Sequence, residues 1–189
     1  KIFTVANPVD NFYYASRYTK NKQIMKKDSS GCKKIVLLYV GRLIESKGIW
    51  DLLQAFKKLN EYYGEDVIEL RIVGDGIILP QLKKWITKNS FNNIILIGFL
   101  NQEEICDEYN AADIFVLPSH YEPWGLVVNE AMNFHLPIIA TSSIGAANEI
   151  VIDDFNGIII PPKDSVALHN AIKLLIDDET KRIDMGSKS

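Results

Sequence analysis

Two cations flank a short loop whose composition suits a phosphate-binding turn. Arg42 and Lys47 lie within residues 41–48, which follow an apolar run ending at Val40. A helix is expected to begin near Ser46 or Lys47, and the amide groups at a helix N-terminus carry partial positive charge. Arg42 and Lys47 could then reach a common point and bind a phosphate or pyrophosphate. Two solvated surface cations are the alternative, and this loop alone does not decide between the two interpretations.

A pair of glutamates lies in the segment 118–130. Glu122 directly precedes Pro123, which is expected in the first turn of a helix, and Glu130 would then lie about two turns in. Each carboxylate can accept two hydrogen bonds from vicinal hydroxyls of a sugar or ribose. Three backbone amides at the helix start are candidate donors for an anion: those of Trp124, Gly125 and Leu126. The alternative, slightly favoured by generic physics, is an acid that complements the helix dipole and a solvated glutamate.

Two further loops follow other apolar runs. Gly74 and Gly76 form a Gly-x-Gly pattern, but the third glycine of a dinucleotide-binding fingerprint is missing, so a tight turn is the favoured interpretation. Phe99 and Leu100 follow Gly98, and Phe99 or the backbone there could support a planar base. Ordinary packing of Phe99 is equally plausible.

The composition excludes several other kinds of site. The chain has 21 Lys and Arg against 24 Asp and Glu, a net charge of −3, so no global basic field exists to bind a nucleic-acid backbone. The three histidines share no metal-ligand spacing, and the sequence has no Asp-x-Asp pair. No Ser/His/Asp or Cys/His set appears at a known motif spacing. We therefore expect neither a bound metal nor a nucleic-acid partner.

Six short apolar runs, rich in β-branched residues, must position these loops. They are residues 35–40, 69–73, 94–97, 114–117, 138–140 and 157–160. Nearly continuous apolar runs of this length suit strands that are buried on both faces of a parallel sheet. In such sheets ligands bind beyond the carboxyl ends of the strands, which is where the loops described above are expected.

Helical patterns lie between the apolar runs. Apolar residues recur at helical spacing over 49–59 and over 168–175, the latter after an N-cap at Asp164. Weaker patterns cover 78–88 and 102–109. The alternation predicts an α/β fold, a Rossmann-like doubly wound parallel sheet of about six strands.

Residues 1–33 differ from the rest because they are polar and lack a sustained period. We interpret them as an interdomain linker segment and tail, with a short anchored piece around Phe12-Tyr13-Tyr14, and residues 34–189 as the ligand-binding domain. No apolar run approaches the roughly 18 residues of a membrane span, and no signal peptide opens the chain. The chain begins with Lys1 and not Met, so we expect a piece of a longer protein.

An ordered set of short motifs runs through the chain from about Asn7 to Gly186. In order they are Asn7-Pro8-Val9-Asp10, Gly41-Arg42-Leu43 with Lys47-Gly48, Val73-Gly74-Asp75-Gly76, Gly98-Phe99, Ala112-Asp113, Pro118-Ser119, Glu122-Pro123-Trp124-Gly125 to Glu130-Ala131, Glu149-Ile150-Val151 and Asn156-Gly157. Together they resemble the C-terminal, donor-binding domain of retaining glycosyltransferases of family 4, which have the GT-B fold. Each motif is short, but the ordered set is highly specific.

The resemblance implies transfer of a sugar from a nucleotide sugar, UDP- or GDP-linked, to an acceptor such as a glycan or lipid, with retention of configuration and without metal or cofactor. It implies that Arg42 and Lys47 bind the diphosphate and stabilise charge on the leaving nucleotide. Glu122 would bind hydroxyls of the donor sugar, and Glu130 the ribose diol. The implied catalytic residues are Arg42, Lys47 and Glu122, and the implied donor-binding residues are Gly41, Arg42, Lys47, Phe99, Leu100, Glu122, Trp124, Gly125, Leu126 and Glu130.

The resemblance also implies a partner, the protein's own N-terminal acceptor domain, which this chain lacks. We expect a cytoplasmic location and a role in polysaccharide biosynthesis, with peripheral contact to the cytoplasmic membrane face through the missing domain as an option. The isolated chain is expected to bind donor but to transfer sugar inefficiently.

Three positions depart from the family pattern. Trp124 stands where Phe is commoner, Gly145-Ala146 replaces a usual Gly-Gly, and His135 stands where Gly commonly ends the helix. We expect His135 to adopt a positive φ at a local cost in stability.

Two other functions remain open. A nicotinamide-dependent oxidoreductase on a Rossmann sheet is disfavoured because no Gly-x-Gly-x-x-Gly follows the first strand. A non-catalytic sugar-nucleotide-binding module is disfavoured by the intact cations and glutamates.

Overall fold

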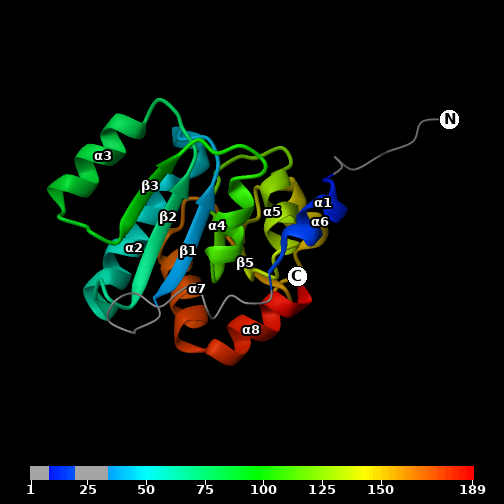
Figure 1. Cartoon of the computed structure of the whole chain (residues 1–189). Helices are drawn as coiled ribbons and strands as arrows, with labels where there is room; N and C mark the ends of the chain where they lie inside the picture. Colours follow the sequence, from blue (N-terminus) through cyan, green and yellow to red (C-terminus); the bar gives the residue numbers. More distant parts are fainter. Residues whose placement is uncertain (1–8, 20–33) are drawn as a thin grey trace.

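The computed structural model describes residues 9–19 and 34–189. The first two residues of the Asn7-Pro8-Val9-Asp10 motif, and the polar stretch 20–33, lie outside the described residues. Within the described ranges, six strands form one parallel sheet in the order β3-β2-β1-β4-β5-β6 (Figure 1). The strands are β1 Ile35–Val40, β2 Ile68–Val73, β3 Ile94–Gly98, β4 Ile114–Leu117, β5 Ile138–Thr141 and β6 Gly157–Ile160. The predicted doubly wound α/β sheet is confirmed.

Helices cover both faces of this sheet. They are α1 Asn11–Arg17, α2 Ile49–Tyr63, α3 Leu79–Lys88, α4 Ile105–Ala111, α5 Leu126–Met132, α6 Gly145–Ile150, α7 Ser165–Asp177 and α8 Glu179–Lys188, with a 3₁₀ turn, η1, at Glu45–Lys47. Helices α2 and α7 pack against each other on one face, and α4 and α5 cover the other (Figure 1). The predicted N-cap of α7 is confirmed, because Oδ1 of Asp164 accepts hydrogen bonds from the amides of Val166 and Ala167.

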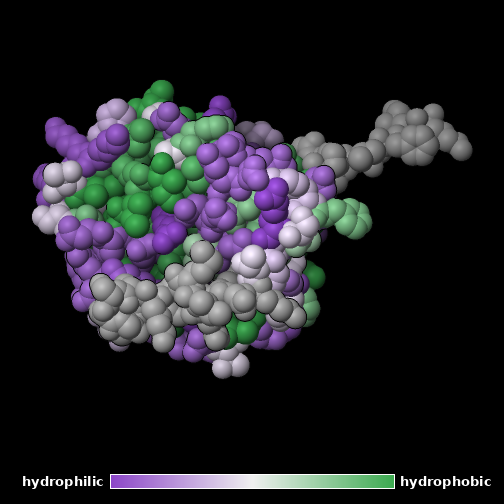
Figure 2. Space-filling model, viewed as in Figure 1, coloured by the Kyte–Doolittle hydropathy of each residue, from purple (hydrophilic) through white to green (hydrophobic). Residues whose placement is uncertain are grey.

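The depth of burial differs from strand to strand. The two strands β4 and β5 are buried along their whole length, as the apolar runs predicted. The edge strand β3 departs from that prediction, because it has a neighbour on one side only and Ile95 is 39% exposed. Figure 2 shows the resulting apolar surface over β2 and β3.

Two helices begin later than the sequence predicted, in each case because of a glycine. Gly48 adopts φ 65°, which ends η1 and makes Gly48 the N-cap of α2, so α2 begins at Ile49 and not near Ser46 or Lys47. A Cβ on Gly48 would lie 2.0 Å from the carbonyl oxygen of Pro118, so glycine is needed for this approach of two loops.

The start of α5 was also predicted too early. Gly125 adopts φ 89° and is the N-cap, so α5 begins at Leu126. Pro123 therefore precedes the helix and is not its first-turn proline, and Glu130 lies about one turn in and not two.

The N-terminal segment packs against the domain through α1. Tyr14 is 5% exposed and its ring meets Phe134 edge-on, at 6.3 Å between centroids. Arg17 pairs with Glu103 at 3.2 Å. Of the predicted anchor, Tyr14 is buried whereas Phe12 is 90% exposed. The boundary proposed at residue 33 stays a prediction.

The structure also tests two expectations, on the backbone of His135 and on membrane-spanning helices. His135 adopts φ 53°, as predicted for a residue in a place where glycine commonly ends the helix. None of the helices in the described part of the chain is both long and apolar enough to cross a membrane.

Candidate functional site

The sheet order brings the two chemically interesting loops together. The order reverses between β1 and β4, which lie side by side, so residues 41–48 and residues 118–125 emerge at neighbouring strand ends. The amide of His120 donates to the carbonyl of Ser46 at 2.8 Å, which joins the two loops directly. Nε2 of His120 also lies 2.6 Å from Oδ2 of Asp51 on α2.

A pocket of about 430 Å³, called here the cation pocket, opens between these loops. Its lining contains most of the predicted site: Gly41, Arg42, Lys47, Glu122, Trp124, Gly125 and Leu126, with Val40, Leu117, Pro123 and Val127. A side chain of β1 holds the loop that carries Arg42, because the hydroxyl of Tyr39 donates a hydrogen bond to the Arg42 carbonyl at 3.0 Å. Arg42 and Lys47 therefore line the same pocket, with Lys47 buried and Arg42 exposed, and their joint binding of a phosphate stays a prediction.

Lys47 and Glu122 form an ion pair inside the cation pocket. Their side chains are only 10% and 19% exposed, so water screens the pair weakly. A solvated surface position, the alternative considered for both cations, is wrong for Lys47. The motifs assigned the two residues to different parts of a ligand, and their contact with each other was not predicted.

The backbone beside this pair offers hydrogen-bond donors. Within the described residues, the amides of Trp124, Gly125 and Leu126 have no hydrogen-bond acceptor, which fits their predicted role. The neighbouring amides of Gly145 and Ala146 are occupied, since they donate to the carbonyls of Glu122 and Trp124 at 3.2 and 2.8 Å. The start of α6 therefore supports the pocket wall, and the Gly145 and Ala146 amides are not free for a ligand.

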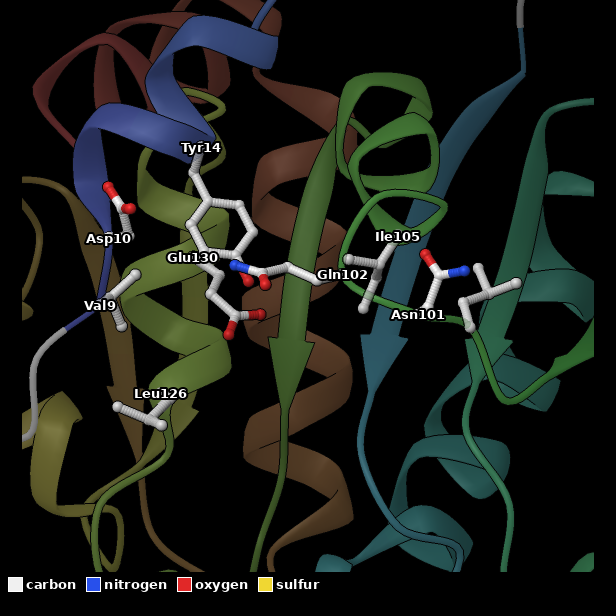
Figure 3. A pocket seen from close by; sticks show the side chains of 9 residues that line it. Val9, Asp10, Tyr14, Asn101, Gln102, Ile105, Leu126 and Glu130 are labelled. Atoms are coloured by element: carbon white, nitrogen blue, oxygen red, sulfur yellow. The ribbon is translucent and has the colours of Figure 1, made fainter.

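A second pocket, called here the Glu130 pocket, has a volume of about 390 Å³ and shares Leu126 with the cation pocket. Figure 3 shows its side chains, which come from three parts of the chain. They are Val9, Asp10 and Tyr14 from the N-terminal segment, Leu100, Asn101 and Gln102 from the connection between β3 and α4 with Ile105 at the start of α4, and Leu126 and Glu130 from α5.

Glu130 is held within this pocket by phenol groups. The hydroxyl of Tyr109 donates to its Oε2 at 2.8 Å. Burial raises the pKa of Glu130, and the hydrogen bonds from Tyr109 and Tyr14 partly oppose that rise. The carboxylate is thus partly desolvated and oriented, which suits recognition of a diol.

Not every predicted residue lines one of these two pockets. Phe99 is 78% exposed and belongs to the lining of neither pocket, whereas its neighbour Leu100 does contribute. Tyr14, Tyr109 and Gln102 were not predicted as site residues, because isolated tyrosines and glutamines carry no motif signal; Tyr14 was predicted only as part of the N-terminal anchor. Across residues 9–19 and 34–189, no group of three or more His, Cys, Asp or Glu side chains is arranged to hold a metal ion.

Comparison with known proteins gives a consistent result. The family model described as "Glycosyl transferases group 1" matches residues 20–189. Alpha-D-kanosaminyltransferase of Streptomyces kanamyceticus is 31% identical over 155 residues, which cover 82% of this chain and 39% of that protein. The chain spans 34–39% of the length of the first curated relatives that it matches.

Solved structures agree with the family match. The C-terminal domain of a glycosyl transferase group 1 family protein (LpcC) from Francisella tularensis has a TM-score of 0.82 and 29% identity, over 96% of this chain and 94% of that chain. Anabaena HepE, solved in complex with UDP and glucose, has a TM-score of 0.77 and 26% identity, over 96% of this chain and 49% of that chain.

Proposed function

The chain belongs to the group 1 glycosyl transferase family, and from this membership we propose that it is the donor-binding domain of a retaining glycosyltransferase. The expected architecture, one C-terminal half-domain of a GT-B enzyme, is confirmed by the agreement with the C-terminal domain of LpcC. The proposed reaction transfers a sugar from a nucleoside-diphosphate sugar to an acceptor such as a glycan or a lipid.

The observation that carries the proposal is the junction of the two pockets at Leu126. A nucleotide sugar presents a nucleoside, a diphosphate and a sugar in linear order. The Glu130 pocket offers a carboxylate for the ribose diol, and the cation pocket offers Arg42, Lys47 and Glu122 for the diphosphate and the sugar. The two pockets therefore supply the complementary groups in the same order as the ligand.

In the proposed mechanism, Arg42 and Lys47 stabilise the negative charge that develops on the leaving nucleoside diphosphate. A bound diphosphate attracts the Lys47 ammonium away from Glu122, which leaves the Glu122 carboxylate to accept hydrogen bonds from the sugar. The free amides of Trp124 and Gly125 add donors at the same place. No metal or other cofactor is part of the proposal.

The choice of donor and the partners belong to the proposal as well. UDP- and GDP-sugars are the candidate donors, and the complex of HepE with UDP and glucose supports UDP as the first to test. The acceptor would be bound by an N-terminal domain of the whole protein. We place the protein in the cytoplasm, and the N-terminal domain is the part that would make any peripheral contact with a membrane. Polysaccharide biosynthesis is the proposed role.

Calorimetric titration of the chain with UDP, GDP and their sugars tests this proposal. Binding of one nucleotide sugar is expected, with about tenfold weaker affinity after Arg42→Ala because one charge-assisted contact is lost. Lys84→Ala, an exposed lysine on α3, is the matched control and should leave affinity unchanged. The absence of binding at millimolar nucleotide by the folded wild-type chain would refute the proposal.

The family match favours this function over the nicotinamide-dependent oxidoreductase considered from the sequence. Titration with NADH, followed by fluorescence, separates the two, since the proposal predicts no saturable NADH binding. A non-catalytic binding module differs from the proposed function only in turnover, which an assay of the full-length protein measures.

A further inference from the structure

Helix α1 contributes to the Glu130 pocket although it lies outside the residues that define the family match. The family model begins at residue 20, whereas α1 spans Asn11–Arg17. The pocket wall nevertheless includes Asp10 and Tyr14 (Figure 3). A segment that precedes the matched domain therefore faces the same cavity as Glu130.

Tyr14 makes the most specific of these contacts. Its side chain points from α1 toward Glu130 and Gln102 (Figure 3). The phenol interacts with the Glu130 carboxylate and with the Gln102 side chain, and its interaction with Glu130 opposes the rise in the pKa of that carboxyl. The ring is 5% exposed and packs edge-on against Phe134, so its direction is fixed by packing.

The two phenols hold Glu130 from different elements. Tyr109 belongs to α4 and Tyr14 to α1, while Glu130 itself lies on α5. An ionised carboxylate has about four acceptor positions, so the hydrogen bond from Tyr109 and a contact with the Tyr14 phenol leave about two positions free. A vicinal diol has two hydroxyl groups and therefore needs two free acceptor positions.

Helix α1 is anchored independently of Glu130. Arg17 pairs with Glu103, and Asn110 bonds both to the Arg17 carbonyl, at 2.9 Å, and to the Thr19 amide, at 3.0 Å. Asn133 donates to the side chain of Asn11 at 3.0 Å. The phenol of Tyr14 is therefore in position before any ligand binds, and a preformed site loses less entropy on binding.

We propose that Tyr14 is a positioning residue of the nucleoside site, which orients the Glu130 carboxylate for the ribose diol and makes α1 a functional part of the donor-binding domain. The proposal rests on the proposed function, since it assigns the Glu130 pocket to the nucleoside. It extends that function to a residue that no motif of the family match contains. Tyr14 acts through Glu130 and not on the reacting atoms.

The test compares Tyr14→Phe with Tyr13→Phe in the full chain, using UDP, GDP and inorganic pyrophosphate as calorimetric ligands. Tyr14→Phe keeps the ring against Phe134 and removes only the hydroxyl. Tyr13→Phe removes a hydroxyl from the adjacent residue, which has no hydrogen bond to Glu130. A thermal melt of each variant establishes that it is folded before titration.

Tyr14→Phe is expected to weaken binding of the nucleotide that the wild type binds by about fivefold, the effect of one ordinary hydrogen bond. Pyrophosphate affinity should stay within about twofold, and Tyr13→Phe should match the wild type for every ligand. Unchanged nucleotide affinity in Tyr14→Phe would overturn the inference, as would an equal loss for nucleotide and pyrophosphate. Failure of the wild type to bind either UDP or GDP would refute the proposed function instead, so the two failures are distinguishable.

Discussion

The ammonium of Lys47 and the carboxylate of Glu122 are paired inside the cation pocket, although 75 positions separate them in the sequence. Each group is the other's counter-ion in a place where water screens charge weakly. A ligand that needs both must separate them, and a ligand with a diphosphate next to a sugar offers each a replacement. Binding of such a donor therefore exchanges one internal ion pair for two contacts with the ligand.

This pairing predicts opposite effects of Glu122→Gln on two ligands. Inorganic pyrophosphate should bind about threefold to tenfold more tightly, because the anion no longer competes with a carboxylate for Lys47. A UDP-sugar should lose the affinity that its sugar adds over UDP, because a carboxylate that accepts from the sugar hydroxyls is gone. Calorimetry on both ligands measures the two effects, and a parallel change in both affinities would contradict the competition argument.

Gly48 and Gly64 give a matched pair for testing how the first loop is held. Both adopt positive φ, 65° and 84°, so alanine is strained at either position. A Cβ on Gly48 would also lie 2.0 Å from the Pro118 carbonyl oxygen, whereas nothing lies within 4 Å of a Cβ on Gly64.

Gly48→Ala should therefore cost about 2–4 kcal/mol of unfolding free energy. Gly64→Ala should cost about 1–3 kcal/mol, because φ 84° with ψ 165° lies in a region that is confined essentially to glycine. Because Gly48 follows Lys47 directly, Gly48→Ala should also weaken pyrophosphate binding, and Gly64→Ala should not. Urea denaturation and calorimetry give the two readouts. Unchanged pyrophosphate affinity in Gly48→Ala would show that the contact between Gly48 and Pro118 does not position Lys47.

Glu130→Gln is expected to raise the stability of the fold while it weakens nucleotide binding. Burial raises the pKa of Glu130, so the folded chain binds this proton more tightly than the unfolded chain. Ionised Glu130 then opposes folding, and its contribution to stability falls as pH rises through its folded pKa. A glutamine does not titrate and its carbonyl oxygen can still accept from Tyr109.

The variant is therefore expected to melt at a higher temperature than the wild type at pH 7, with a smaller difference under acidic conditions where Glu130 is protonated in both states. Nucleotide affinity at pH 7 should fall by about tenfold, because a diol bonds less strongly to a neutral amide than to a carboxylate. Melting curves across pH, combined with calorimetry, test both. A melting difference that does not depend on pH would contradict the assignment to Glu130.

The strands of the sheet could be predicted well because each one is encoded by a short, continuous run of apolar residues. Runs such as 35–40 and 114–117 are apolar over their whole length and rich in β-branched residues, and the structure has strands with those bounds. Most of the predicted donor-binding residues also line a pocket, because they follow these strands directly and strand ends share one edge of the sheet.

What the sequence could not predict depends on contacts between distant segments. The starts of α2 and α5 are set by the φ angles of Gly48 and Gly125, and those angles serve close approaches to Pro118 and Ile144. The place of Tyr14 beside Glu130 likewise requires α1 to fold back onto α5. No local period or propensity encodes such contacts.

The contact between His120 and Asp51 yields the last prediction. Nε2 of His120 lies 2.6 Å from Oδ2 of Asp51, and both side chains are about three-quarters buried or more, at 25% and 20% exposed. The contact joins the start of α2, just after Lys47, to the loop that carries Glu122. It therefore stabilises the arrangement of the two loops as well as the fold.

A double-mutant cycle with His120→Ala and Asp51→Ala should give a coupling free energy of about 1 kcal/mol in urea denaturation. The same cycle with Lys181→Ala in place of His120→Ala should give a value near zero, because the ion-pair partner of Lys181 is Asp154. Pyrophosphate should bind more weakly to either single variant of the His120–Asp51 pair, since Lys47 and Glu122 lie on the segments that this pair joins. Additive stability changes in the first cycle would mean that the contact does not hold the loops together.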